Sequence, residues 1–237
     1  MKNFAKTIIL ALALVMVIPL AQARQIKGSG NVIKETRELK NFTALDVGGA
    51  FNVELIKSTE SKIIIETDDN IMPTITTKVS GGTLEIDNTR DINNPTKLQL
   101  TIYYQQLEEL DISGAADLYS EDMFIADFLD LDISGAAEIT LQIQVNNLDA
   151  DFSGAADINL EGTVNNAKIE ASGASTISAY GLEILELGLE ASGASSVKIL
   201  VLKEMSIDSS GASSVRYKGS PSIKIIDVSG ASSFRKG

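Results

Sequence analysis

The residues of this chain that could carry chemistry are serines, acidic residues and a few lysines, because the sequence contains no histidine and no cysteine. This composition excludes Ser-His-Asp triads, cysteine nucleophiles, zinc sites built on His or Cys, and disulfides. Two Ser-x-x-Lys spacings occur, Ser195 to Lys198 and Ser233 to Lys236, but neither has the accompanying motifs of penicillin-binding enzymes. The sequence therefore predicts a protein that is not an enzyme, with no catalytic residues and no cofactor.

The phrase Ser-Gly-Ala is repeated seven times after residue 110, with 18 to 21 residues between successive glycines. An active site is normally built once, from unlike groups that converge. Seven copies at one spacing therefore predict a structural corner rather than a site. An earlier segment, "LDVGGAFNVEL" (45–55), places Gly49 in the same position. The predicted corner glycines are Gly49, Gly114, Gly135, Gly154, Gly173, Gly193, Gly211 and Gly230.

An acidic residue stands three positions before the glycine in each of the seven copies: Asp111, Asp132, Asp151, Glu170, Glu190, Asp208 and Asp227. Stacked in register, such carboxylates would lie about 5 Å apart and repel by roughly 1 kcal/mol in water before salt screening. We interpret the column as a solvated outer face. Calcium bridging is the functional alternative, since oxygen ligands suit this ion, but the glycine-aspartate nonapeptide of calcium β-rolls is missing. The seven residues are weak calcium candidates, and no metal site is predicted.

The apolar residues around the phrase define the element that positions it. In the third copy they are Leu148, Ala150, Phe152, Ala155, Ile158 and Leu160. Steps of two indicate a strand that buries alternate side chains. The two steps of three, on either side of Ala155, predict a corner at which this alanine fills the inside angle. By the same reasoning, Ala115 fills the corner of the first copy.

One corner, one strand and one polar turn in each unit of about 19 residues predict a parallel β-solenoid whose coils bury a continuous core by stacking. A helical solenoid is disfavoured because runs with a period of 3.6 are missing and β-formers dominate the segments. A β-propeller is disfavoured because its blades need about 40 residues.

We divide the chain into three parts. Residues 1–23 predict a signal peptide, with Lys2 and Lys6 before an apolar stretch and "AQA" at the cleavage position. Residues 24–109 form less regular β coils; within them, 28–109 are expected to start or cap the stack, and "VSGGTLEI" (79–86) loosely resembles a corner. Residues 110–237 form the regular solenoid, continuous with the preceding part as one domain, and the final "RKG" is expected to place charge on its far end.

The mature chain would be strongly acidic. The full chain has a net charge of −12, and residues 24–237 contain 18 basic and 32 acidic residues, a net charge of −14. Binding to nucleic acid or to anionic membranes depends on clustered Lys and Arg, and no such cluster is visible along the sequence. We therefore expect no nucleic acid partner and no integral membrane segment after signal cleavage. The oligomeric state is left open.

Several features together resemble a known family. They are the signal peptide, the pattern "F-x-x-L-x-V-x-G-x-F-x-V-x-L" (42–55), "GGTLEI" (81–86) and the serial "SGA[AS]" corners. This combination is similar to the autotransporter adhesin head domain (head GIN domain) family of exported bacterial proteins, common in the Bacteroidetes. The resemblance covers nearly all of 28–237. It implies a single-stranded right-handed β-helix with no established enzymatic activity and no catalytic residues.

These observations predict a non-enzymatic protein of the cell envelope or surface, exported through the inner membrane to the periplasm, the outer surface or the medium. Its function would be adhesion or interaction through a coil face carrying Ser, Thr and acidic residues. The alternative is a glycan-binding or polysaccharide-active β-helix, although aromatic platforms for sugars are scarce: Tyr180 and Tyr217 are the tyrosines of the late coils. The partner would be an envelope protein or a glycan.

Overall fold

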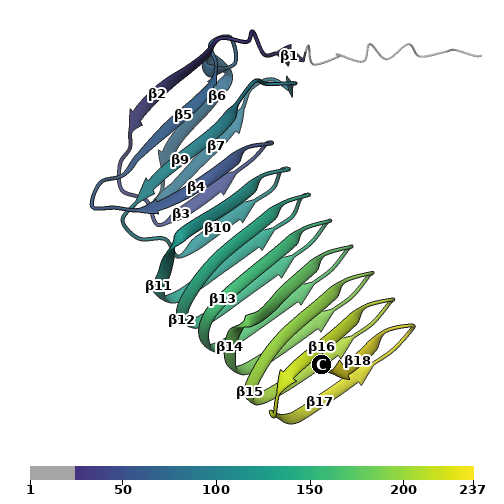
Figure 1. Ribbon diagram of the computed structural model, residues 1–237. Helices are drawn as coiled ribbons and strands as arrows, with labels where there is room; N and C mark the ends of the chain where they lie inside the picture. The colour runs from purple at the N-terminus through teal and green to yellow at the C-terminus, as the bar shows by residue number, and fades with distance from the viewer. Residues whose placement is uncertain (1–24) are drawn as a thin grey trace, which may run out of the picture.

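The computed structural model describes residues 25–237, so the predicted signal peptide lies outside the described residues. These residues form a stack of β-coils that runs from an irregular N-terminal end to a last coil near the C-terminus (Figure 1). The regular strands are long because each continues around one rounded end of its coil. They are β11 (Asp117–Ile133), β12 (Glu138–Phe152), β13 (Asp157–Ala171), β14 (Thr176–Ala191) and β15 (Ser196–Ser209). After β15, β16 (Ser214–Gly219) and β17 (Ser222–Val228) form the two legs of one coil, and β18 (Ser233–Lys236) pairs with β16 as the first leg of the next.

Successive coils pair in parallel and in register, so that equivalent residues of the repeat become neighbours. Phe152 of β12, for example, lies between Ile133 of β11 and Ala171 of β13. Each coil has two legs. The leg before the Ser-Gly-Ala corner forms sheet A and the leg after it forms sheet B, with the core between them. The predicted parallel β-solenoid with coils of about 19 residues is confirmed.

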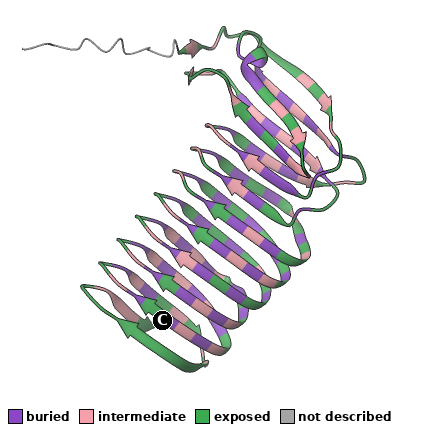
Figure 2. Ribbon diagram, turned by 180° about the vertical axis from the view of Figure 1, so that it is seen from behind, coloured by how far each residue is buried: buried purple, intermediate pink, exposed green. Residues whose placement is uncertain are grey.

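The core is built by alternation of buried and exposed residues along both legs, visible as bands of colour in Figure 2. In the third copy Phe152, Ala156, Ile158 and Leu160 are buried, but Ala155 is exposed. The prediction that Ala155 and Ala115 fill the inside corner is therefore wrong. The residue one position later, Ala156 or Ala116, does so. The step from Phe152 to Ala156 is four residues, so the alternation passes the corner without a change of phase.

The N-terminal end contains short strands and one 3-10 turn. They are β1 (Ile26–Lys27), β2 (Val32–Glu38), β3 (Ala44–Val47), β4 (Asn52–Lys57), β5 (Lys62–Asp68), η1 (Met72–Thr74), β6 (Ile75–Ser80), β7 (Thr83–Asn88), β8 (Ile92–Asn93), β9 (Leu98–Tyr104) and β10 (Glu109–Ile112). Strands β7, β3 and β10 continue sheet A, and β9 and β4 continue sheet B. Antiparallel strands complete this end, β6 beside β7, and β5 and then β2 beside β9.

The segment "VSGGTLEI" is not a corner. Gly81 and Gly82 form the two-residue turn of the antiparallel hairpin β6–β7, and both have positive φ, 63° and 92°. Two consecutive positive φ angles define the type I′ turn that suits a two-residue hairpin. The resemblance arises because both kinds of turn use glycine for the same backbone freedom.

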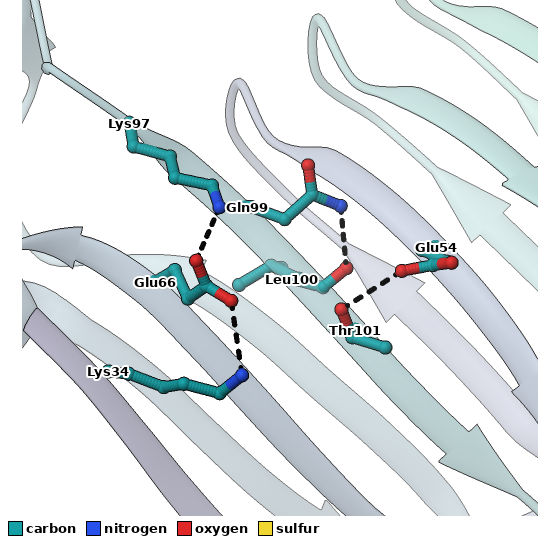
Figure 3. Close-up of polar contacts among 7 residues, drawn as sticks. All are labelled: Lys34, Glu54, Glu66, Lys97, Gln99, Leu100 and Thr101. Carbon is teal, nitrogen blue, oxygen red and sulfur yellow. Dashed lines mark hydrogen bonds and ion pairs between the residues drawn. The ribbon is translucent and has the colours of Figure 1, made fainter.

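Charged pairs connect the outer strands of this end across their exposed face (Figure 3). Glu66 of β5 accepts hydrogen bonds from Lys97 beside β9 and from Lys34 of β2, the latter at 3.3 Å. These two bonds lower the pKa of Glu66. Thr101 of β9 donates to Glu54 of β4 at 3.1 Å. The antiparallel strands are thus joined to the first coil by side chains as well as by backbone pairing.

Asp68, at the end of β5, connects three segments of the N-terminal end. Its buried carboxylate accepts hydrogen bonds from the Gly30 N–H (2.7 Å), the Thr96 N–H (2.7 Å) and the Thr96 hydroxyl (2.8 Å). Burial opposes ionisation, but these donors prevail and lower the pKa of Asp68. A buried carboxylate with several donors is a structural anchor.

We expect Asp68→Ala to lower the urea midpoint of unfolding, because three donors would be left without an acceptor in a buried site. Asp69→Ala is the control, since the exposed Asp69 accepts from Ser29 and Asn31, which water can satisfy instead. The lowered pKa means that the contribution of Asp68 is present at neutral pH and lost as the pH falls through that pKa. The loss on mutation should therefore shrink in acid. An equal effect of both substitutions would contradict the anchor role.

The last described coil carries the predicted charge and also apolar surface. Arg235 and Lys236 lie in β18. On the other leg, β17 exposes Ile225 and Ile226 at 62% and 52% of their surface.

Candidate functional site

The acidic residues that precede the corners form a continuous column on the outer side of sheet A. The parallel register places Asp111, Asp132, Asp151, Glu170, Glu190, Asp208 and Asp227 directly beside one another. The same register adds Asp46 of β3 and Glu85 of β7 at the N-terminal end. Glu85 was missed because it belongs to a hairpin, and no repeat spacing points to it. We call these nine residues the acidic column.

The electrostatics of the column follow from this stacking. Partial burial, followed by the neighbouring carboxylates, raises the pKa values of Asp46, Asp111 and Asp151. Asp130, two residues before Asp132 on the same face, has a raised pKa for the same reasons. Lys168 is a cation within this face, and it contacts Glu170 at 2.6 Å and Asp149 at 3.9 Å. These four carboxyl groups therefore hold their protons more tightly than isolated carboxyl groups do.

The column does not gather its carboxylates around one point. In residues 25–237 no group of three or more acidic side chains is placed to hold a metal ion. A straight column with a strand spacing of about 4.8 Å offers a cation its two nearest carboxylates rather than the six to eight oxygens that calcium takes. A shallow groove of about 210 Å³ follows the column beside the corners, lined by residues that include Glu170, Glu190, Asp208, Ser172, Ser192 and Ser210. The groove presents carboxylates and hydroxyls to solvent.

We expect Asp111→Asn to raise the melting temperature at pH 7 by about 1 °C, because it removes one repelling carboxylate from the column. The raised pKa values of Asp46, Asp111 and Asp151 mean that the folded chain binds these protons more tightly than the unfolded chain. Their protonation therefore adds stability as the pH falls from 7 toward the ordinary carboxyl range near 4. This gain is lost as the pH rises through the raised values. Between pH 7 and pH 4, the melting temperature of Asp111→Asn should rise less than that of Asp91→Asn. Asp91 is the control because it lies outside both sheets. A larger rise in melting temperature for Asp111→Asn than for Asp91→Asn would contradict this account.

The corner glycines stack in a second column, next to the acidic one. Six of them have positive φ angles, between 69° and 111°: Gly49, Gly154, Gly173, Gly193, Gly211 and Gly230. Gly114 and Gly135 lack this feature, but their backbones lie against the corner glycine of the preceding coil, Gly49 and Gly114 respectively. From Gly114 onward, the alanine after each glycine donates its N–H to the glycine carbonyl of the preceding coil, for example Ala155 to Gly135 at 3.0 Å. The corner is thus a backbone column without converging side chains.

The structure separates both Ser-x-x-Lys pairs from any shared site. Ser195 is buried, and its hydroxyl has no hydrogen-bond partner, whereas Lys198 lies on the outer side of sheet B. Ser233 donates to Ser214 at 3.3 Å, and Lys236 contacts Ser220 at 3.4 Å. Neither serine is placed beside its lysine as an activated nucleophile would be.

The interpretation that the chain has no basic cluster is wrong for the folded protein. Lys198, Arg216 and Arg235 are 18 and 19 residues apart in the sequence, and the register of β15, β16 and β18 makes them direct neighbours. We call these three residues the basic column. Applying the repeat spacing to the cations as well as to the acids would have found it.

The described residues thus define a parallel β-solenoid with an acidic face and a short basic column, in which no helix is long and apolar enough to cross a membrane. The chain belongs to the family described as "Putative auto-transporter adhesin, head GIN domain", which matches residues 41–221. No curated protein matches the chain.

Solved structures share the fold. A "putative adhesin" from Bacteroides fragilis NCTC 9343 is 25% identical, with a TM-score of 0.85 over 89% of this chain and 99% of that one. A "putative adhesin" from Parabacteroides merdae ATCC 43184 is 19% identical, with a TM-score of 0.73 over 90% and 99% of the two chains. A "putative lipid binding protein" from Parabacteroides distasonis ATCC 8503 is 18% identical, with a TM-score of 0.73 over 90% and 100%. The family assignment matches the resemblance derived from the sequence.

Proposed function

We propose that this chain is a non-enzymatic, exported interaction module of the bacterial surface, which holds a glycan or an envelope protein against a flat face of the solenoid. The observation that carries the proposal is the uniformity of the stack. Seven corners follow at intervals of 18 to 21 residues, with no long insertion between β11 and β18. Enzymes normally place their catalytic groups on loops that leave the scaffold. Here the coils offer extended rows of like side chains, which suit multivalent contact instead. The family description and the "putative adhesin" from Bacteroides fragilis support the same role.

The alternative is a polysaccharide-active β-helix of the envelope. Paired carboxylates are the usual catalysts of glycoside hydrolysis, and the acidic column supplies many carboxylates. They stand in one row along the stack, however, whereas the paired carboxylates of glycosidases flank the bond that is cleaved. The interaction module therefore remains the proposal.

The test is a glycan array probed with fluorescent protein 24–237, together with a reducing-end assay on every glycan that binds. We expect retention of a subset of glycans, or of an envelope protein in a parallel capture experiment with identified partners, and no new reducing ends over 24 hours. Turnover of any bound polysaccharide would overturn the non-enzymatic role.

A further inference from the structure

The basic column is unusual because its three like charges are stacked in register and form no ion pairs. Nine ion pairs are formed among residues 25–237, and they use Lys34, Arg37, Lys62, Lys78, Lys97, Lys168, Lys203 and Lys224. Lys198, Arg216 and Arg235 take part in none of them. Like charges directly opposite each other on neighbouring strands are destabilising, and the chain has 32 acidic residues with which to pair. The stacking of three unpaired cations therefore does not stabilise the fold, and it needs another explanation.

The surroundings of the column are neutral and rich in hydroxyl groups. Two residues earlier on the same strands, Ser196, Ser214 and Ser233 form a parallel row on the same face. In the coil before Lys198, the equivalent position is Ser178. Arg216 and Arg235 are exposed, and Lys198 is half-buried. Three cations and a row of hydroxyls thus face solvent, with serines at the positions that precede the cations on their strands and at the position beside Lys198 in the preceding coil.

An aromatic side chain borders the column. Tyr180 lies beside Lys218, whose ammonium group is 4.2 Å from the centre of the ring. Lys218 follows Arg216 by two residues on β16, so it extends the positive charge along the strand, away from the column. Tyr217 stacks on Phe234 with ring centres 4.9 Å apart and stiffens the strands that carry Arg216 and Arg235.

We propose that Lys198, Arg216 and Arg235 bind a linear acidic polysaccharide that lies along the axis of the solenoid. The three cations extend over about 10 Å, two strand spacings of about 4.8 Å each. A polymer with one negative group per sugar can place successive anions beside successive cations, and the guanidinium groups can bind carboxylate or sulfate in a bidentate way. The serine row would meet the sugar hydroxyls. This inference rests on the proposed function and names the partner class for sheet B.

Other anionic partners fit the face less well. An anionic membrane would meet the whole flat face, and in earlier coils that face carries Asp117, Glu138 and Asp157 in register. Nucleic acid binding commonly uses about six to ten phosphate contacts, more than this column supplies. A second copy of the chain carries the same net charge of −12. A polysaccharide can follow the column alone.

The experiment measures binding of size-defined polygalacturonate to protein 24–237, with dextran sulfate as the sulfated probe and dextran as the neutral one. The variant is Lys198→Gln/Arg216→Gln/Arg235→Gln. The matched control, Lys34→Gln/Lys78→Gln/Lys168→Gln, removes the same charge from cations that are already paired. We expect binding of at least one acidic probe at low salt, weakening as NaCl is raised, and no binding of dextran. The column variant should lose at least tenfold in affinity and the control less than twofold. Melting curves establish that both variants are folded.

Several results would overturn the assignment. They are failure of both acidic probes to bind, equal loss in the two variants, or tighter binding of anionic vesicles or duplex DNA than of either glycan. Self-association in sedimentation that the column variant alone abolishes would make the column a contact between copies. Cleavage of a probe would overturn the proposed function, whereas a chain that neither binds nor cleaves these probes overturns only the column assignment.

Discussion

Gly135→Ala should destabilise the solenoid by about 3 kcal/mol, within the range for steric and backbone strain at a position that cannot relax. A Cβ atom at Gly135 would lie 1.7 Å from the carbonyl oxygen of Gly114 and 2.7 Å from its carbonyl carbon. These are backbone atoms of the adjoining coil, so no side chain can rotate away. The same carbonyl accepts the Ala136 N–H at 3.1 Å, and moving it would weaken the pairing of the two corners. The expected fall in melting temperature is about 10 °C for a domain of this size.

Gly188→Ala is the matched control, because it is also a glycine of the regular stack. It lies in β14 on the outer side of sheet A, without positive φ, and a Cβ there meets no atom within 4 Å. We expect it to be neutral or to stabilise by about 0.5 kcal/mol, since glycine weakens a strand interior. Urea titrations measure the free energy of unfolding of the two variants. If Gly135→Ala were no more harmful than Gly188→Ala, the corners would not require glycine for close approach.

The repeat made most of the architecture predictable, because the parallel register converts a sequence spacing directly into a neighbour relation. Asp111 and Asp132, 21 residues apart, are adjacent in space for this reason. The phase at the corner was mispredicted because two small residues, such as Ala155 and Ala156, follow the glycine in each of the seven Ser-Gly-Ala copies. Without a contrast in size or polarity, the pattern does not show which of the two points inward, and a slip of one residue exchanges the faces.

The parts of the molecule outside the repeat were less accessible to prediction. The antiparallel pairing of β2, β5 and β9 joins segments with no common spacing, and the anchor Asp68 lies outside the Ser-Gly-Ala repeats, so no repeat spacing points to it. Its three donors come from residues 28 to 38 positions away. The basic column, in contrast, could have been predicted from the sequence. Arg216 and Arg235 look isolated in the sequence, but the repeat period contains the information that they meet.

Phe152→Ala should cost about 4 kcal/mol, as large-to-small substitutions of buried aromatic residues do. The ring is fully buried in β12, and its neighbours in register are Ile133 and Ala171. Ala171 and the following Ala191 leave room beside the ring, so that one large side chain serves adjoining small positions. Removing it would open a cavity that the stacked backbones cannot close, because each coil is held on both sides by its neighbours.

The control is Phe128→Ala, in which the ring is 45% exposed on β11 and its removal should cost less than about 1 kcal/mol. A second variant, Phe152→Ala/Ala171→Phe, moves the ring by one coil and should recover part of the loss, because the total core volume is restored. The measurement is the urea midpoint of each variant together with its slope. Equal losses at Phe152 and Phe128 would contradict a core packed by stacking. A double variant less stable than Phe152→Ala would show that each coil is packed as a fixed layer rather than as part of one continuous core.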